Sequence, residues 1–179
     1  MTKNIIIVPG SVRPTSVARE LAKRIDGMIN QREDLTAKIV DLGELDLPFF
    51  DNPIMPAHPD FKVDNDNVKQ WTKLVDEADG VLFVSPEYNH TISAVQKNAI
   101  DWINDEWKDK PVASVSFGFG GGKLSLENIK EALGNLKANF LDSEAQLYLT
   151  KDLDVDGTPL DDSLVDHKIN DAIDKLASA

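Results

Sequence analysis

Five apolar runs, each followed by polar or turn-forming residues, are spaced along the chain. They occupy residues 4–8, 37–42, 80–85, 112–117 and 145–149. The first and third runs, "NIIIV" and "GVLFVS", are apolar almost throughout, which is typical of parallel strands buried on both faces of a sheet. We therefore expect each run to form a β-strand.

Between the runs, apolar residues recur at helical spacing. On residues 16–30, Val17, Leu21, Ile25 and Met28 form one stripe. We expect further helices over residues 66–77, 92–103, 123–139 and 162–177. This alternation predicts an α/β fold, a flavodoxin-like doubly wound five-stranded parallel sheet of order 2-1-3-4-5 with helices on both faces. Because ligands of such sheets bind at the carboxyl ends of the strands, the loops after the first, third and fourth strands are the candidate site.

Residues 43–65 form a long connection with four prolines and the adjacent aromatics Phe49 and Phe50. Such a length is unusual for a simple connection. Its composition fits a lid over a site and an irregular surface excursion equally well.

Length and composition narrow the class of protein. A chain of 179 residues suits a single domain spanning residues 1–179. With 31 acidic and 19 basic residues the net charge is -12, which disfavours nucleic acid and anionic membranes as partners. The absence of cysteine excludes disulfides, thiol nucleophiles and Cys-ligated metals. No apolar run has the length of a signal peptide or a membrane span, so we expect a cytoplasmic protein.

The loop after the first strand carries an anion-binding pattern. In "VPGSVRPTS" a buried strand leads directly into a helix, whose first N–H groups attract an anion. Ser11, Thr15 and Ser16 add hydroxyl donors, and Arg13 adds a fork for two phosphate oxygens. The loop lacks the second glycine and the Gly-Lys-Ser/Thr of nucleotide loops, which favours a monophosphate. The alternative is that Thr15 or Ser16 is an ordinary N-cap and Arg13 is solvated.

Two further loops fit a flat polar ring. After the third strand, the rigid turn Pro86-Glu87-Tyr88-Asn89 offers backbone donors edge-on, although such a turn is also common as a purely structural element. After the fourth strand comes "SFGFGGG", residues 116–122, whose glycines allow close approach of the backbone to a ligand or simply a flexible loop. Its position at the same sheet edge favours the ligand-binding interpretation.

Two segments, "GSVRPTS" and "PEYNHTISAVQKNAIDW", resemble the NADPH-dependent FMN reductases, a flavodoxin-like family that includes quinone, azo-dye and chromate reductases. The resemblance runs from Ile5 to about Leu149. It implies two groups of residues around FMN. The phosphate is expected at Ser11, Arg13, Thr15, Ser16 and the amide of Val17. The isoalloxazine ring is expected between Pro86, Glu87, Tyr88 and Asn89 on one side and Ser116, Gly118, Gly120 and Gly121 on the other.

The same resemblance implies an oxidoreductase that passes hydride from NADPH or NADH through FMN to a small-molecule electron acceptor such as a quinone, a flavin or an azo compound. No catalytic side chain is expected, because the flavin carries the chemistry. A homodimer or homotetramer is implied, with Asp101 and Trp102 on an interface helix. The competing interpretation is a flavodoxin-type electron carrier or flavin-binding module without NAD(P)H turnover. Phe49, Phe50 and Tyr88 are candidates to stack near the ring.

The chain departs from the family pattern at Ala18, where asparagine is common, and at Ser93, Ala94 and Gln96. Loss of the asparagine removes a possible hydrogen bond near the phosphate, whereas the other changes affect the helix start or oligomer packing.

Two weaker patterns contain metal-ligating residue types, but we do not expect either of them to form a metal site. "DLDVDG" at residues 152–157 begins like a calcium loop, but its twelfth position is Ser163 rather than glutamate, so we interpret it as an acidic turn. His58, His90 and His167 lack a ligand spacing and are interpreted as surface residues.

Overall fold

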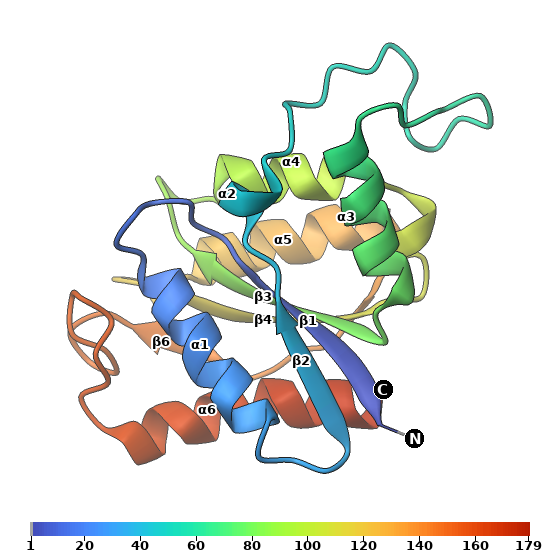
Figure 1. Ribbon diagram of the computed structural model, residues 1–179. Coiled ribbons are helices and arrows are strands. Elements are labelled where there is room, and N and C mark those ends of the chain that lie inside the picture. The colour runs from blue at the N-terminus through green and yellow to red at the C-terminus, as the bar shows by residue number, and fades with distance from the viewer. Residues whose placement is uncertain (1) are drawn as a thin grey trace.

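The computed structural model describes residues 2–179, which contain one parallel sheet with helices on both faces (Figure 1). The strand order is β2-β1-β3-β4-β5, and a sixth strand, β6, also pairs with β4. The predicted order is therefore confirmed. The strands are β1 (Lys3–Pro9), β2 (Leu35–Ile39), β3 (Gly80–Pro86), β4 (Pro111–Gly118), β5 (Asn139–Phe140) and β6 (Gln146–Tyr148).

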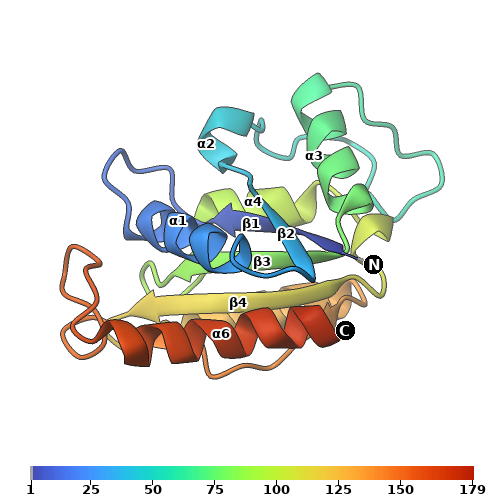
Figure 2. The ribbon, with the colours of Figure 1, turned by 60° about the horizontal axis from the view of Figure 1, so that its bottom comes forward.

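The helices are distributed over the two faces of the sheet. They are α1 (Val17–Ile29), α2 (Leu42–Leu45), α3 (Asp66–Glu77), α4 (Ala94–Asp101), α5 (Lys123–Asn135) and α6 (Asp162–Ser178), with a 3-10 turn η1 (Asp105–Trp107). Figure 2 shows the sheet nearly edge-on, with α3 and α4 on one side and α6 on the other. Side-chain caps set several helix starts; Asn65, for example, accepts hydrogen bonds from the first amides of α3.

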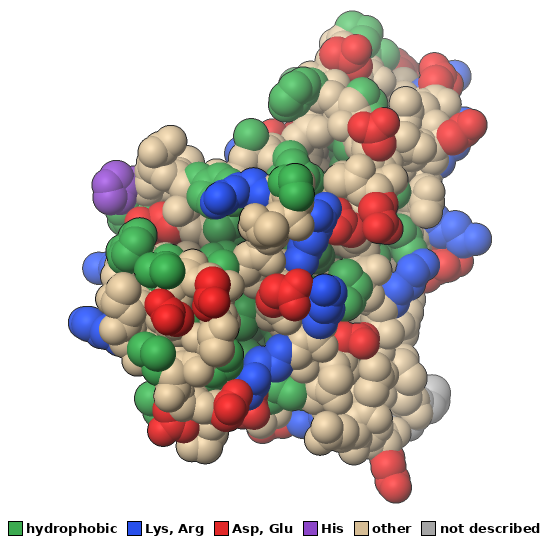
Figure 3. All heavy atoms as spheres, turned by 60° about the vertical axis from the view of Figure 1, so that its left-hand side comes forward, with side chains coloured by type: hydrophobic (Ala, Val, Ile, Leu, Met, Phe, Trp, Pro, Cys, Tyr) green, Lys and Arg blue, Asp and Glu red, His purple; other side chains and the backbone are tan. Residues whose placement is uncertain are grey.

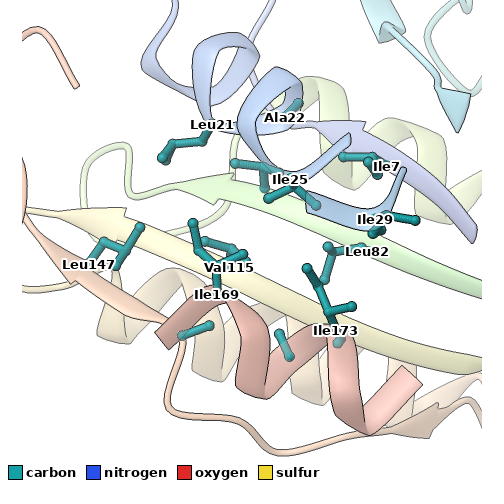
Figure 4. Packing of buried hydrophobic residues seen from close by; sticks show 14 of the residues in the cluster. Ile7, Leu21, Ala22, Ile25, Ile29, Leu82, Val115, Leu147, Ile169 and Ile173 are labelled. Atoms are coloured by element: carbon teal, nitrogen blue, oxygen red, sulfur yellow. The ribbon is translucent and has the colours of Figure 1, made fainter. Parts of the chain in front are cut away.

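Alternate residues of β1 enter two separate hydrophobic cores. Ile5 and Ile7 pack with α1 and α6, whereas Ile6 and Val8 pack with α3, α4 and α5. Figure 4 shows the first core, in which Ile25 and Ile173 from the two helices approach Leu82 of β3. Because both faces of the central strands are buried, their sequences are apolar at consecutive positions.

The fifth predicted strand, residues 145–149, corresponds to β6, and the short strand β5 lies in residues where no strand was predicted. β5 pairs with the start of β4, and β6 pairs with its end at Ser116–Gly118. The helix predicted to reach residue 139 stops at Asn135, since Lys137 adopts a positive φ of 61° and turns the chain back to the sheet. Asn139 consequently belongs to a strand.

The second predicted strand ends earlier than residue 42. Asp41 accepts a hydrogen bond from the amide of Gly43 at 2.8 Å and caps the short helix α2. Within residues 2–179, no helix combines the length and the apolar composition needed to cross a bilayer.

Candidate functional site

The loop after β1 begins at a glycine that no other residue can replace without movement. A Cβ added to Gly10 would lie 2.2 Å from Cδ of Gln96, a side chain that is fully buried. The Gly10 amide donates to the carbonyl of Val84 at 2.9 Å, which keeps the end of β1 beside β3. The side-chain amide of Gln96, a residue at which the chain departs from the family pattern, thus packs directly beneath the candidate phosphate loop.

Ser16 is the N-cap residue of α1, and its hydroxyl is buried without a hydrogen-bond partner. The Ser16 residue is 8% exposed. An ordinary N-cap side chain accepts from the first-turn amides, but Ser16 makes no such bond. A buried hydroxyl beside the first amides of a helix forms a set of donors suited to an anion. The N-cap interpretation of Ser16 thus holds for its position but not for its side chain.

The turn after β3 is a tight hairpin joined to the first loop. Tyr88 and Thr91 exchange two backbone hydrogen bonds of 3.0 and 3.1 Å, and Asn89 and His90 between them both have positive φ. The Tyr88 hydroxyl lies 2.8 Å from the hydroxyl of Ser11. The two segments that carried the family resemblance are therefore in direct contact.

The glycine-rich loop after β4 packs closely against this turn. Glu87 donates its amide to the Phe117 carbonyl at 3.0 Å. Gly121 and Gly122 adopt φ values of 70° and 69°, and a Cβ on Gly122 would lie 2.5 Å from the Phe117 nitrogen. The loop is a defined structure that requires glycine, not merely a flexible connection.

These loops surround a cavity of about 890 Å³ at the carboxyl edge of the sheet. A volume of this size is typical of small-molecule and cofactor sites. Figure 3 faces this edge, where hydrophobic side chains lie between acidic and basic ones. The predicted site residues that line the cavity are Ser11, Arg13, Thr15, Ser16, Val17, Pro86, Glu87, Tyr88, Asn89, Gly118 and Gly120.

Two predicted site residues do not line the cavity. Ser116 is fully buried, and its hydroxyl lies 3.0 Å from that of Ser114. Ser114 continues this polar chain to Ser85, which also accepts from Gln96 at 3.0 Å. Gly121 instead packs against the ring of Tyr148. Ser116 and Gly121 therefore belong to the packing around the glycine-rich loop and not to the lining of the cavity.

Sequence reasoning missed a wall of the cavity formed by Val155 and Asp156. Gly157, with φ of 92°, packs on Val17 and brings this segment to the start of α1. The backbone N–H of Thr158 holds the pKa of the Asp156 carboxyl below its usual range. The only available signal was that this segment follows the last strand at the same sheet edge.

The segment resembling a calcium loop uses its carboxylates within the turn. Asp152 accepts from the Tyr148 amide at 2.8 Å and pairs with Lys168 at 2.8 Å. Residues 152–157 thus form the predicted acidic turn before α6. Across residues 2–179, no group of three or more His, Asp and Glu side chains is arranged to bind a metal ion.

Phe49 and Phe50 do not line the cavity, so the prediction that they stack near the ring is not supported. Phe50 packs edge-on against Trp102 at 5.0 Å, and its amide donates to Asn98 at 2.9 Å. Phe49 is 78% exposed elsewhere on the surface. The long connection crosses α4, away from the cavity, which matches the surface excursion and not a lid (Figure 1).

Other departures from the family pattern have structural roles. Ala18, in the first turn of α1, is fully buried and packs into the first hydrophobic core. Ser93 caps α4 by accepting from the Gln96 amide at 3.3 Å. Asp101 pairs with Lys97, while Trp102 is buried and donates to Pro48, so the interface role of this helix stays a prediction.

Comparison with known proteins identifies the relatives of this chain. An NAD(P)H-dependent FMN reductase from a Nectria species is 33% identical over 133 residues, covering 72% of this chain and 66% of the relative. An NAD(P)H-dependent FMN reductase of Saccharomyces cerevisiae is 34% identical over 145 residues, covering 75% of both chains. The chain therefore spans about two thirds to three quarters of the length of these relatives. Other relatives are named as quinone reductases and as an azoreductase.

A solved structure from Paracoccus denitrificans, a flavoenzyme NAD(P)H:(acceptor) oxidoreductase, superposes with a TM-score of 0.76 over 98% of this chain and 96% of its own. At 23% identity this likeness supports the flavodoxin-like fold. The family profile for NADPH-dependent FMN reductase matches residues 3–150. This chain is therefore a member of the NADPH-dependent FMN reductase family, an enzyme family whose cofactor is FMN and whose electron donor is NAD(P)H.

Proposed function

We propose that this chain catalyses electron transfer from NAD(P)H to a small acceptor, a quinone or a flavin, with FMN bound in the cavity at the carboxyl edge of the sheet. The observation that carries the proposal is the buried, unpartnered hydroxyl of Ser16 at the start of α1, inside the cavity lining. An oxygen in that position lacks only an acceptor such as a phosphate.

The phosphate end of the cavity fits one phosphate. Arg13 supplies positive charge, and the first amides of α1 supply donors. Glu20 and Asp156 line the same cavity and would repel a longer phosphate chain. The proposed phosphate residues are Ser11, Arg13, Thr15, Ser16 and Val17.

The ring end lies between the turn at residues 86–89 and the glycine loop. When bound, FMN supplies the ring that accepts hydride from NAD(P)H and reduces the acceptor. Pro86, Glu87, Tyr88 and Asn89 bound one side of that space, and Gly118 and Gly120 bound the other. We propose that Ser116 and Gly121 support this end without touching the ligand.

The mouth of the cavity fits a flat apolar acceptor. Phe119 and Val155 line the cavity and are 75% and 61% exposed, so their apolar surface is free to contact a second ring. This chain's contribution is to orient the two rings and to exclude water between them, rather than to move a proton through a side chain. A quinone meets these requirements better than a charged acceptor.

The arginine tests the proposal directly. Arg13→Ala removes a charge-assisted contact of about 2 kcal/mol and is expected to raise the dissociation constant of FMN about 30-fold. Riboflavin, which lacks the phosphate, is the matched ligand, and its affinity should not change. Fluorescence quenching of each flavin measures both constants, with Lys69→Ala on α3 as a charge-matched control away from the cavity. Equal loss for both flavins would contradict the phosphate assignment.

Turnover separates the enzyme from an electron carrier. FMN-loaded protein is expected to oxidise NADPH or NADH steadily when a quinone is present. Lack of oxidation with fully bound FMN would instead indicate a flavodoxin-type carrier. We further propose that residues 1–179 form a single domain, that the protein is cytoplasmic and that it assembles as a homodimer or homotetramer.

A further inference from the structure

The side chain of Glu87 makes contacts that neither the phosphate loop nor the ring requires. This side chain is 14% exposed. Oε2 accepts a hydrogen bond from the backbone amide of Leu124 at 2.9 Å, and Oε1 lies 3.4 Å from Nδ1 of His90. Leu124 lies in the first turn of α5, so Glu87 reaches from the turn after β3 to a helix that begins after β4.

Helix α5 has no cap from its own N-cap residue. That residue is Gly122, which has no side chain and a φ of 69°. The first amides of a helix need acceptors, and a carboxylate there also interacts favourably with the helix dipole. Glu87 supplies this carboxylate from another loop, a distant substitute for the missing N-cap.

The glycine loop, residues 118–122, is therefore bounded on two sides. On one side, a Cβ on Gly118 would lie 3.2 Å from Cβ of Glu87, so the Gly118 backbone lies close to the base of the Glu87 side chain. On the other side, the ring of Tyr148 packs against Gly121. Release of the Glu87 contact would free the first turn of α5 and the loop that leads into it.

We propose that Glu87 is a positioning residue: by capping α5 at Leu124 it fixes the glycine loop against the turn at residues 86–89 and so shapes the ring end of the cavity. This inference rests on the proposed FMN site. It gives the carboxylate of Glu87 a role separate from the backbone contacts expected at this residue.

The test combines amide exchange with binding of two flavins. In the FMN-free full chain, Glu87→Ala is expected to speed hydrogen exchange of the Leu124 amide about tenfold or more, because the amide loses its acceptor. The dissociation constants of FMN and riboflavin should both rise about five- to tenfold, since the defect lies at the ring end. This equal loss distinguishes Glu87 from Arg13, whose variant should affect FMN alone.

Two variants serve as comparisons. Glu87→Gln keeps an oxygen acceptor of the same size without the charge, so exchange and both affinities should recover part of the way toward wild type. Glu127→Gln removes a carboxylate from the same helix that is 56% exposed and lies 3.9 Å from Lys123, and it should change nothing. Glu87→Gln also keeps the test decisive if Glu87→Ala fails to fold.

Unchanged Leu124 exchange in Glu87→Ala would overturn the capping role. Faster exchange with unaltered riboflavin affinity would overturn the link to the ring end. If the wild-type protein bound neither flavin, the proposed function would fail, while the exchange rates would still decide whether Glu87 fixes the glycine loop.

Discussion

Ser16 offers a sharp test, because a cap that serves a ligand should behave unlike a cap that serves the fold. Its hydroxyl is buried, makes no hydrogen bond and sits at the start of α1. Asn65, in contrast, accepts from the amides of Asn67 and Val68 at the start of α3. The two residues occupy the same helical position with opposite bonding.

The structure sets the magnitudes for replacement by alanine. Asn65→Ala loses a working cap and should lower the free energy of unfolding by about 1 kcal/mol. Ser16→Ala loses no bond and removes a buried hydroxyl that lacks a partner, so the FMN-free protein should be unchanged or up to about 1 kcal/mol more stable. In a chain of this length the Asn65 loss corresponds to roughly 2–4 °C in melting temperature.

Binding should respond in the opposite order. Ser16→Ala should raise the dissociation constant of FMN about tenfold, since a donor to the phosphate is lost, whereas Asn65→Ala should leave it unaltered. Urea unfolding of the FMN-free protein and fluorescence titration with FMN measure both effects. A loss of 1 kcal/mol or more in FMN-free Ser16→Ala would refute the reasoning, as would an unchanged FMN affinity.

Two further outcomes follow from the packing and from the pKa shifts. Gly10→Ala places a Cβ 2.2 Å from the buried Gln96 amide and should lower the free energy of unfolding by about 2–3 kcal/mol. Adding Gln96→Ala should recover much of this loss, as measured by urea unfolding of the single and double variants. Additive effects of the two substitutions would show that the contact is harmless. The Ser163 hydroxyl and the Leu164 amide donate hydrogen bonds that lower the pKa of Asp161, the N-cap of α6. The contribution of this cap to the free energy of unfolding is therefore complete above the unfolded pKa of about 3.9 and is lost as the pH falls through the lower folded pKa. The protection factor of the Leu164 amide, which corrects its exchange rate for the intrinsic effect of pH, should fall over that acid range in wild type and stay level in Asp161→Asn. Equal acid responses of the two proteins would contradict the assignment.

Much of the fold and of the candidate site could be predicted because the signals were local. The "NIIIV" run of β1 is apolar at consecutive positions, which parallel central strands require, and β1 does have both faces buried. The turn at Pro86–Asn89 and the loop at Ser11–Ser16 were placed at the carboxyl edge by chain order alone. In the structure the two are joined through Tyr88 and Ser11.

The failures arose where distant residues decide the local conformation. Phe50 is an apolar aromatic residue that was expected near the ring, but it packs against Trp102 instead of lining the cavity. The positive φ of Lys137 ended α5 early, and no residue type at that position announces such a turn. Val155 and Asp156 reached the cavity only because Gly157 packs against Val17.

By itself, the sequence determined the strand order and the edge of the sheet that carries the cavity, and it predicted a loop suited to a single phosphate. These properties depend on hydrophobic period and on residue types close together in the chain. Only the tertiary structure decided that the hydroxyl of Ser16 has no partner, that Gln96 closes the space beneath Gly10 and that Glu87 caps α5. Each of those depends on which side chain from a distant segment fills, or leaves empty, the space beside a polar group.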